Sequence, residues 1–352
     1  MEAAVKRALA TNVFKPTGSG GGGCISKGSS YFTDKGTVFV KSNHKPGAKD
    51  MFQGEKVGLD AITATGSIRC PKAISVVMID DSNPSAGLVM ENLEMSYSKG
   101  STQAKLGEQL ANMHLYNQKL LDKKGTEDCG CMRKTEEKEI DFQRPVTKFG
   151  FYVPTSCGFV SQENNWRDDW ATFYVEEKLQ PNINILNEKK PDKQLNELWP
   201  ICRVKILETL GKLEKVVPAL LHGDLWSGNI ASVDGEPVIF DPASFYGHSE
   251  YDFGIARMFG GFTSDFFKAY HKVIPKAPGF EQRLDSYELY HHINHCPLFT
   301  LFIGYISAVA TGVPLWISCE ELQTAEPHYR PWLPGYCPRF SRANKLYSTW
   351  HC

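Results

Sequence analysis

A short polar stretch with apolar neighbours, Leu-His-Gly-Asp-Leu-Trp-Ser-Gly-Asn at 221–229, constrains the fold of this chain more than any other feature. Asp224 and Asn229 lie five positions apart in it, and a Ser-Gly pair between them supplies turn-forming residues. The apolar run 237–240 then has the pattern of a strand and leads into Asp241. We therefore expect two carboxylates and one amide to lie together beside a loop and a strand end.

This spacing matches the catalytic loop of kinases, where an Asp accepts the proton of the attacking hydroxyl and an Asn binds Mg²⁺. A carboxylate at the end of the next strand can bind the metal ion that bridges the phosphates of ATP. Taken alone, His-Gly-Asp could be only a turn, and Asp241 only the cap of a strand. The combined pattern is much rarer, and it predicts a phosphotransferase.

A glycine-rich stretch at 18–28 lies near the N-terminus. Glycine has no Cβ, so its backbone N–H groups can approach phosphate oxygens, although a glycine run by itself is equally typical of a flexible linker. Strand-like segments at 31–34 and 37–41 follow directly, and Lys41 ends the second as a phosphate-contacting lysine does in kinases. Glu55, on the helix predicted next, is the candidate partner of Lys41. Taken alone, Lys41 or Glu55 would be interpreted as a solvated surface residue.

The predicted secondary structure divides the chain into two parts. Residues 74–79 and 87–90 are predicted as two further strands, and the backbone after the second could pair with adenine as a kinase hinge does. From Ser96 apolar residues recur every three to four positions, which predicts a helix. A charged loop is expected at 122–141 and an amphipathic helix at 194–215. The first part is therefore β-rich and the rest mainly helical.

Composition excludes some classes of protein. The chain has 352 residues and a formal charge of -1, so nothing in its charge favours nucleic acid or an anionic membrane as a partner. Its ten cysteines are scattered, and no second pair with metal-ligand spacing follows Cys129 and Cys131. Residues 1–17 lack the apolar core of a signal peptide, and Glu2 counts against a mitochondrial leader. Reduced thiols in the cytosol are therefore expected.

The sequence resembles the fructosamine-3-kinase / ketosamine-3-kinase family from near the N-terminus to about His295. The motifs that carry the resemblance are residues 23–26, 38–41, 89–91, 105–109, 168–170, 222–229 and 241–248. His-Gly-Asp-Leu and Asp-Pro-Ala are shared with aminoglycoside and choline kinases. Trp226 and the Ser-Phe-Tyr-Gly-His run at 244–248 are not, which makes the resemblance specific.

The resemblance implies an α+β, protein-kinase-like fold of the aminoglycoside-phosphotransferase type with two lobes. Residues 1–95 would form a β-rich nucleotide-binding lobe, and residues 96–295 a mainly helical catalytic and substrate lobe. The implied activity is ATP-dependent phosphorylation of the 3-hydroxyl of ketosamines, with Mg²⁺ as the metal. The substrates would be glycated proteins or small ketosamines. Because the 3-phosphate makes the adduct unstable, this activity would repair glycation.

The resemblance also implies residue roles. Asp224 would be the proton acceptor, Asn229 and Asp241 the Mg²⁺ ligands, and Trp226 would face the ketosamine. The residues expected at the nucleotide are Gly23, Cys24, Ile25, Ser26, Lys41, Glu55, Glu91, Asn92 and Leu93. Family members use the phosphate-loop cysteine for disulfide-linked dimers, so Cys24 is a candidate redox switch in a protein that is otherwise expected to be monomeric.

Residues 296–352 are expected to depart from the sequence pattern of this family. The segment from Leu298 to Ser318 contains no charged residue and has the length of a membrane-span candidate. Three interpretations stay open: a translated intron or alternative exon, an apolar packing segment, and a membrane anchor. Glycines and a proline interrupt the segment and count against the anchor.

Two other functions compete with ketosamine phosphorylation. One is a different small-molecule kinase of the aminoglycoside or choline type, and the other is a pseudokinase that binds nucleotide without turnover. The joint presence of Lys41, Asp224, Asn229 and Asp241 argues against the pseudokinase. The sequence does not distinguish fructosamine, ribulosamine and psicosamine as the preferred substrate.

Overall fold

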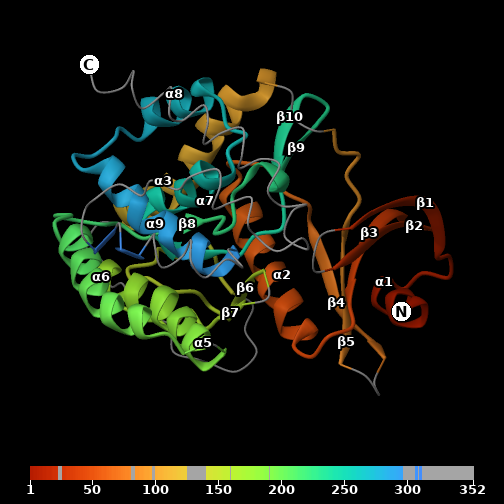
Figure 1. The fold of residues 1–352 in the computed structure, drawn as a ribbon. Helices are drawn as coiled ribbons and strands as arrows, with labels where there is room; N and C mark the ends of the chain where they lie inside the picture. Colours follow the sequence, from red (N-terminus) through yellow and green to blue (C-terminus); the bar gives the residue numbers. More distant parts are fainter. Residues whose placement is uncertain are drawn as a thin grey trace.

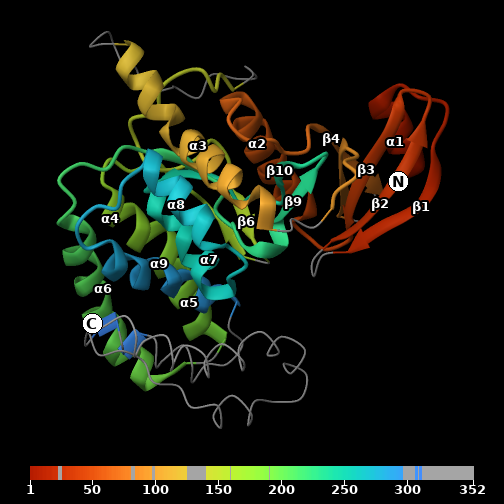
Figure 2. The ribbon, with the colours of Figure 1, turned by 90° about the horizontal axis from the view of Figure 1, so that it is seen from above.

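The computed structural model describes residues 1–22, 26–80, 84–96, 100–124, 140–158, 160–189, 191–295, 306–307 and 309–310. Within them, a five-stranded sheet near the N-terminus stands beside a larger and mainly helical body (Figure 1). The same separation is visible from above, where the sheet and its helix α1 lie at one end of the molecule (Figure 2). The expected α+β class is confirmed.

The sheet is formed by β1 (Lys15–Gly22), β2 (Lys27–Thr33), β3 (Gly36–Asn43), β4 (Ala73–Asp80) and β5 (Ser85–Glu91). Its order is β1-β2-β3-β5-β4, and every neighbouring pair is antiparallel. The predicted turn between the second and third strands is confirmed, with Thr33 paired to Gly36. The glycine-rich stretch begins as a strand, because β1 continues to Gly22.

Two helices cover the sheet. Helix α1 (Glu2–Leu9) buries Ala4 and Val5 against a small apolar cluster that includes Val38 and Val40 of β3. Successive side chains of a strand point to opposite faces, so Lys41 points away from α1. On that other side lies α2 (Ala48–Thr65), which connects β3 to β4 and stands between the sheet and the helical body (Figure 1). The alternation in β3 thus directs Lys41 towards α2.

The helical body follows. Its helices are α3 (Gln103–Lys124), α4 (Trp170–Phe173), a π-helical segment (Tyr174–Leu179), α5 (Gln180–Lys189), α6 (Lys193–Gly211), α7 (Asp252–Phe259), α8 (Ser264–Val273) and α9 (Phe280–His295), with 3₁₀ turns at Gly100–Thr102, Ser227–Asn229 and Ser249–Tyr251. Its short strands are β6 (Thr155–Cys157), β7 (Val160–Gln162), β8 (Ala219–Leu221), β9 (Ile230–Val233), β10 (Glu236–Ile239) and β11 (Phe245–Gly247). They pair as β6 with β7, β9 with β10, and β8 with β11.

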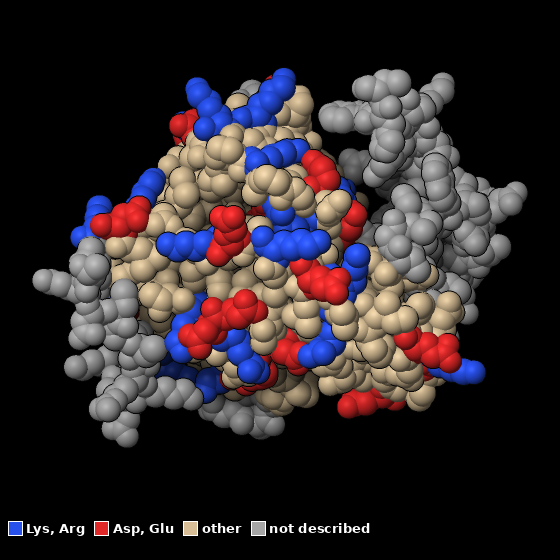
Figure 3. All heavy atoms as spheres, turned by 90° about the vertical axis from the view of Figure 1, so that its left-hand side faces the viewer, with Lys and Arg blue, Asp and Glu red and all other residues tan. Residues whose placement is uncertain are grey.

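Local sequence signals account for several helix ends. The carboxylate of Asp192 accepts from the backbone N–H of Leu195 and so caps α6, and Asp169 caps α4 by accepting from Thr172. The predicted helix 194–215 is confirmed but ends at Gly211. The face of the helical body seen from the left of Figure 1 carries interspersed acidic and basic side chains, in line with the small net charge (Figure 3).

Some expectations fall outside the described residues. Most of the charged loop expected at 122–141 lies there, as does nearly all of the segment 296–352. Of that segment, residues 306–307 and 309–310 are described as helical, and Ile306 is buried. Among the described parts of the chain, no helix combines the length and apolarity needed to cross a membrane. The division of the chain at residue 95 stays a prediction, between the end of β5 at Glu91 and the start of α3 at Gln103.

Candidate active site

Lys41 joins the sheet to the helical body through two ion pairs. Its Nζ lies 2.7 Å from Oε1 of Glu55 on α2 and 2.9 Å from Oδ1 of Asp241. Burial lowers the pKa of Lys41, but the charges of Asp241 and Glu55 outweigh burial and raise the pKa above its usual value. The lysine therefore stays charged at neutral pH. The structure brings together the two residues that the sequence paired, and adds Asp241 to them.

Asp224 lies on a loop after β8 that crosses another stretch of backbone closely. Gly223 has a φ of +82°, and a Cβ there would lie 2.2 Å from the carbonyl oxygen of Ala243. The backbone N–H of Ala243 donates to the carbonyl of His222 at 2.9 Å. Only glycine fits this crossing, because it tolerates the left-handed backbone and adds no side chain.

The side chains of Asn229 and Asp241 meet Asp224 around this crossing. Nδ2 of Asn229 donates to the backbone oxygen of Asp224 at 2.9 Å and to its Oδ2 at 3.2 Å. The backbone N–H of Phe240 donates to the carbonyl of Asn229 at 3.1 Å, which places the next residue, Asp241, beside the loop. Asp241 itself has a φ of +58°, a left-handed conformation that Asp adopts more readily than most residues. The three polar groups of the motif thus form one site.

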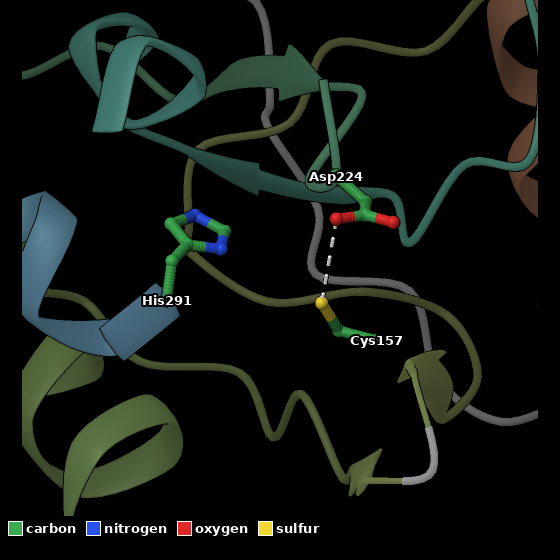
Figure 4. Close-up of side chains that lie close together, drawn as sticks. All are labelled: Cys157, Asp224 and His291. Atoms are coloured by element: carbon green, nitrogen blue, oxygen red, sulfur yellow. Dashed lines mark hydrogen bonds between the residues drawn. The ribbon is translucent and has the colours of Figure 1, made fainter. Parts of the chain in front are cut away.

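The surroundings of the Asp224 carboxyl favour its protonated form. The side chain is half-buried, and burial together with the charge of Asp241 raises its pKa to about 7. The thiol of Cys157 donates to Oδ1 of Asp224 across 3.7 Å. Figure 4 shows Cys157 of β6, Asp224 and His291 of α9 converging from three parts of the chain. Neither Cys157 nor His291 was predicted at the site, because no local motif marks them.

A second carboxylate, which is fully buried, accepts hydrogen bonds from the backbone of the loop that carries Asp224. Asp252, at the start of α7, accepts from the backbone N–H groups of His222 at 2.9 Å and Gly223 at 2.8 Å, and contacts Nε2 of His114 at 3.1 Å. The other ring nitrogen of His114 lies 2.8 Å from the hydroxyl of Tyr270. Both ring nitrogens of the buried His114 therefore have partners. No motif in the sequence indicated this contact between Asp252 and the loop.

His222 links the same loop to the strand end. Its Nδ1 accepts from the backbone N–H of Asp224 at 3.2 Å, so Nε2 carries the proton and donates to the carbonyl of Phe240 at 2.9 Å. Burial lowers the pKa of His222, which keeps this ring neutral. The histidine of the motif is therefore a structural tie between the loops that carry Asp224 and Asp241.

The expected nucleotide-contacting residues fall into two groups. Gly23, Cys24 and Ile25 lie outside the described residues, whereas Ser26 immediately precedes β2. The side chains of Glu91 and Asn92 are used within the sheet. Glu91 accepts from the backbone N–H of Lys72 at 3.2 Å, and Oδ1 of Asn92 accepts from the hydroxyl of Ser30 at 2.6 Å. A contact with adenine would therefore have to come from the backbone of 91–93.

Trp226 lies two residues after Asp224 and is half-buried. Its ring packs against Phe259 of α7 with centroids 5.5 Å apart. The indole also covers Gly228, where a Cβ would lie 2.3 Å from the ring. The small residue in the turn therefore makes room for the indole next to the loop.

Solved structures define the class of this fold. A putative fructosamine-3-kinase from Haemophilus somnus 129PT superposes with a TM-score of 0.67 at 22% identity, over 89% of this chain and 97% of that one. The apo form of a thermostable mutant of an aminoglycoside phosphotransferase gives a TM-score of 0.54 at 10% identity, over 89% and 99% of the two chains. The fold is therefore that of the protein-kinase-like phosphotransferases, as expected.

Sequence relatives define the family. The fructosamine kinase family model matches residues 3–129 and 137–313. A ketosamine-3-kinase of Mus musculus is 48% identical over 295 residues, covering 84% of this chain and 93% of the mouse protein. A chloroplastic protein-ribulosamine 3-kinase of Arabidopsis thaliana is 39% identical over 293 residues, 82% of this chain and 79% of its own length. This chain belongs to the fructosamine kinase family.

The extent of the family match corrects one expectation. The sequence resemblance was expected to end near His295, but the match continues to residue 313. The first part of the apolar segment that starts at Leu298 therefore lies within the family region.

Proposed function

We propose that this protein is an ATP-dependent kinase that phosphorylates the 3-hydroxyl of ketosamines on protein lysines or small amines, so that the sugar is then lost. The observation that carries the substrate class is the 48% identity with a protein named ketosamine-3-kinase. The geometry adds a carboxylate that can act as a base beside a charged lysine and two cation-binding side chains. Positioning and charge neutralisation of this kind are what phosphoryl transfer requires.

Asp224 is the proposed base. It takes the proton of the 3-hydroxyl as the bond from that oxygen to the γ-phosphorus forms, while the bond from this phosphorus to the bridging oxygen of ADP breaks. A base works best when its pKa lies near the working pH, and burial with the charge of Asp241 raises the pKa of Asp224 to about 7. Asn229 orients the carboxylate through its contact with Oδ2.

Asn229 and Asp241 are the proposed Mg²⁺ ligands. The donor set fits this ion, because carboxylate and amide oxygens are among its preferred protein ligands. Nδ2 of Asn229 donates to Asp224, so the amide oxygen is the atom of Asn229 that can bind a cation. When bound, the ion would neutralise charge on the phosphates of ATP.

Lys41 is proposed to contact the α- and β-phosphates, with Glu55 holding its ammonium group in position. The backbone of 91–93 is proposed for adenine, and the glycine-rich segment Gly23–Ser26 for the phosphates. A redox switch at Cys24, a monomer that forms disulfide-linked dimers through this residue, and a cytosolic location complete the proposal. The plant relatives differ on the last point, since they are named chloroplastic.

Trp226 is the proposed contact for the ketosamine. Its half-buried indole lies beside the base, and an aromatic face can cover the apolar side of a sugar or a cationic amine. An aminoglycoside phosphotransferase shares the fold with this chain at only 10% identity, whereas the relatives that are 48% and 39% identical are named for ketosamine and ribulosamine kinases. A pseudokinase is disfavoured because Lys41, Asp224, Asn229 and Asp241 are all present and brought together.

The test is turnover on a defined set of acceptors. Purified full-length protein with Mg²⁺ and ATP is incubated with lysine carrying fructose-, ribulose- or psicose-derived ketosamines, and mass spectrometry follows the gain of one phosphoryl group and the later loss of the sugar. A 3-deoxy ketosamine, which lacks the acceptor hydroxyl, is the matched control and should stay unmodified. Turnover of choline or an aminoglycoside with none on any ketosamine would overturn the proposal.

A further inference from the structure

Three side chains of different chemistry converge beside the proposed base. The Sγ of Cys157, a carboxylate oxygen of Asp224 and a ring nitrogen of His291 all lie within 4.8 Å of one another. Figure 4 shows the three side chains directed to a common point. Cys157 and His291 are fully buried, whereas Asp224 is half-buried and reachable from outside.

The three donors are held in place by the surrounding fold. Nδ2 of Asn294 donates to the carbonyl of Cys157 at 3.0 Å and so ties β6 to α9, the helix that carries His291. The imidazole of His291 packs between rings, with its centroid 5.4 Å from that of Tyr251 and 5.0 Å from that of Tyr290. Asp224 is fixed by the backbone crossing at Gly223. Metal sites bind best when their donors are fixed before the ion arrives.

The donor set selects a class of ion. A thiolate, an imidazole and a carboxylate together suit Zn²⁺ and related thiophilic cations, whereas Mg²⁺ takes oxygen ligands. In tetrahedral zinc sites the bonds are about 2.0–2.3 Å long, so donor atoms lie about 3.3–3.8 Å apart. Cys157 and Asp224 already have this spacing at 3.7 Å, and a ring nitrogen of His291 lies within 4.8 Å of both donor atoms.

We propose that Cys157, Asp224 and His291 form a binding site for a thiophilic divalent cation such as Zn²⁺, and that an ion bound there blocks phosphoryl transfer. The thiol proton of Cys157 leaves to solvent as the sulfur–metal bond forms, and the charge of the ion then neutralises the thiolate and the neighbouring carboxylate of Asp224. Three protein ligands leave a fourth position for water.

The inhibitory half of this inference depends on the proposed function, because it requires Asp224 to act as the base. A carboxylate oxygen bound to a cation cannot accept the proton of the sugar hydroxyl. Cys157 contacts Oδ1 of Asp224, whereas Asn229, a proposed Mg²⁺ ligand, contacts the other carboxylate oxygen, Oδ2. The ion should therefore compete with the ketosamine rather than with ATP, and excess Mg²⁺ should not displace it.

The first test measures binding without turnover. Full-length protein is titrated with Co²⁺, whose thiolate complexes absorb through sulfur-to-metal charge transfer, and Zn²⁺ is then used to displace the cobalt. We expect this band in the wild type and its loss in Cys157→Ser, with an affinity at least about tenfold weaker in His291→Gln. Cys202→Ser is the matched control, because it removes another fully buried thiol far along the chain from the cluster, and it should retain the band.

Thermal unfolding without metal shows whether each variant folds. If Cys157→Ser does not fold, the affinity of His291→Gln still decides the test. A band and an affinity that are unchanged in both variants would place the metal at other cysteines and overturn the proposal. Loss of the band in Cys202→Ser with retention in Cys157→Ser would do the same.

The second test measures inhibition of phosphorylation by Zn²⁺ at a fixed excess of Mg²⁺ and ATP. We expect inhibition that is relieved by more ketosamine, and an inhibitory concentration at least about tenfold higher in His291→Gln. If the function is wrong, metal binding persists while no ketosamine is phosphorylated. If the metal site is wrong, phosphorylation persists and the cluster variants leave metal binding unchanged.

Discussion

Asp252 and Asp224 are two carboxylates on either side of the same loop, and their surroundings act on them in opposite directions. Asp252 is completely buried, yet its hydrogen bonds with His114 and with the backbone N–H of Gly223 outweigh burial and lower its pKa below the usual range. Asp224 is less buried, but burial and the charge of Asp241 outweigh its hydrogen bonds with Asn229 and the thiol of Cys157, and its pKa rises to about 7.

If depth of burial alone decided the pKa, Asp252 would have the higher pKa of the two. The hydrogen bonds and charges around each carboxyl, and not its burial alone, therefore decide which one is a fixed anion that supports the loop and which can exchange a proton. The comparison separates a structural acid from a reactive one within a few residues of backbone, and four experiments can break or sharpen it.

The largest effect is expected from Asp224→Asn. The amide keeps the shape but cannot accept the hydroxyl proton, so kcat on a ketosamine should fall by about 10³-fold. Nucleotide affinity, measured by calorimetry, should change little because Lys41 and Asp241 remain. The thermal midpoint should not fall, since no well-satisfied anion is lost. Near-normal turnover in this variant would remove Asp224 as the base.

Asp252→Asn tests the other carboxylate. Replacing a buried anion that accepts from two backbone N–H groups should lower the free energy of unfolding by about 3 kcal/mol. Chemical denaturation measures this, with the exposed Asp265→Asn on α8 as the matched control, expected within about 0.5 kcal/mol of the wild type. Equal stability of the two variants would contradict the structural role of Asp252.

The pH dependence of kcat/KM for the ketosamine should report the reactive carboxyl. Its folded pKa of about 7 means that the basic form is depleted about tenfold for each pH unit below that value. Because this folded pKa lies above the unfolded one, the contribution of Asp224 to stability is present at acidic pH and is lost as the pH rises through about 7.

Glu55→Gln is the control for this profile. It should lower activity but keep the acidic limb, whereas the residual activity of Asp224→Asn should lack it. A limb that disappears in Glu55→Gln would assign the titration to the lysine pair instead.

Cys157→Ala should have the smallest effect. The thiol hydrogen bond lowers the pKa of Asp224 against the larger effect of burial, so its removal should move the acidic limb to higher pH. Cys157→Ser, which keeps a hydroxyl donor, should move it less. Rate measurements across the pH range decide between the two, and a limb that moves to lower pH in Cys157→Ala would show that the thiol does not donate to Asp224.

The sequence predicted what local motifs encode. Asp224, Asn229 and Asp241 lie in one short stretch, and the strand and helix carrying Lys41 and Glu55 follow from their patterns. The bond between Lys41 and Asp241 spans 200 positions of sequence, yet it was within reach because both residues belong to a recognisable pattern.

Other parts of the site depend on packing that no motif marks. Cys157 reaches Asp224 across 67 positions because β6 packs against α2 so closely that a Cβ on Gly54 would lie 2.4 Å from the carbonyl oxygen of Pro154. The π-helical segment was also missed, since its wider turn has no composition of its own. It carries Lys178 fully buried, and burial lowers the pKa of this lysine well below its usual value.

The backbone crossing at Gly223 has a consequence for motion. His222 and Ala243 are joined backbone to backbone with no space for a side chain at Gly223, so we expect Asp224 and Asp241 to move as one unit. Lys41 belongs to the sheet, and its 2.9 Å contact with Asp241 spans the boundary between the two bodies. A swing of the sheet relative to the helices would stretch this contact, which makes it a natural place to attach a distance probe for opening and closing.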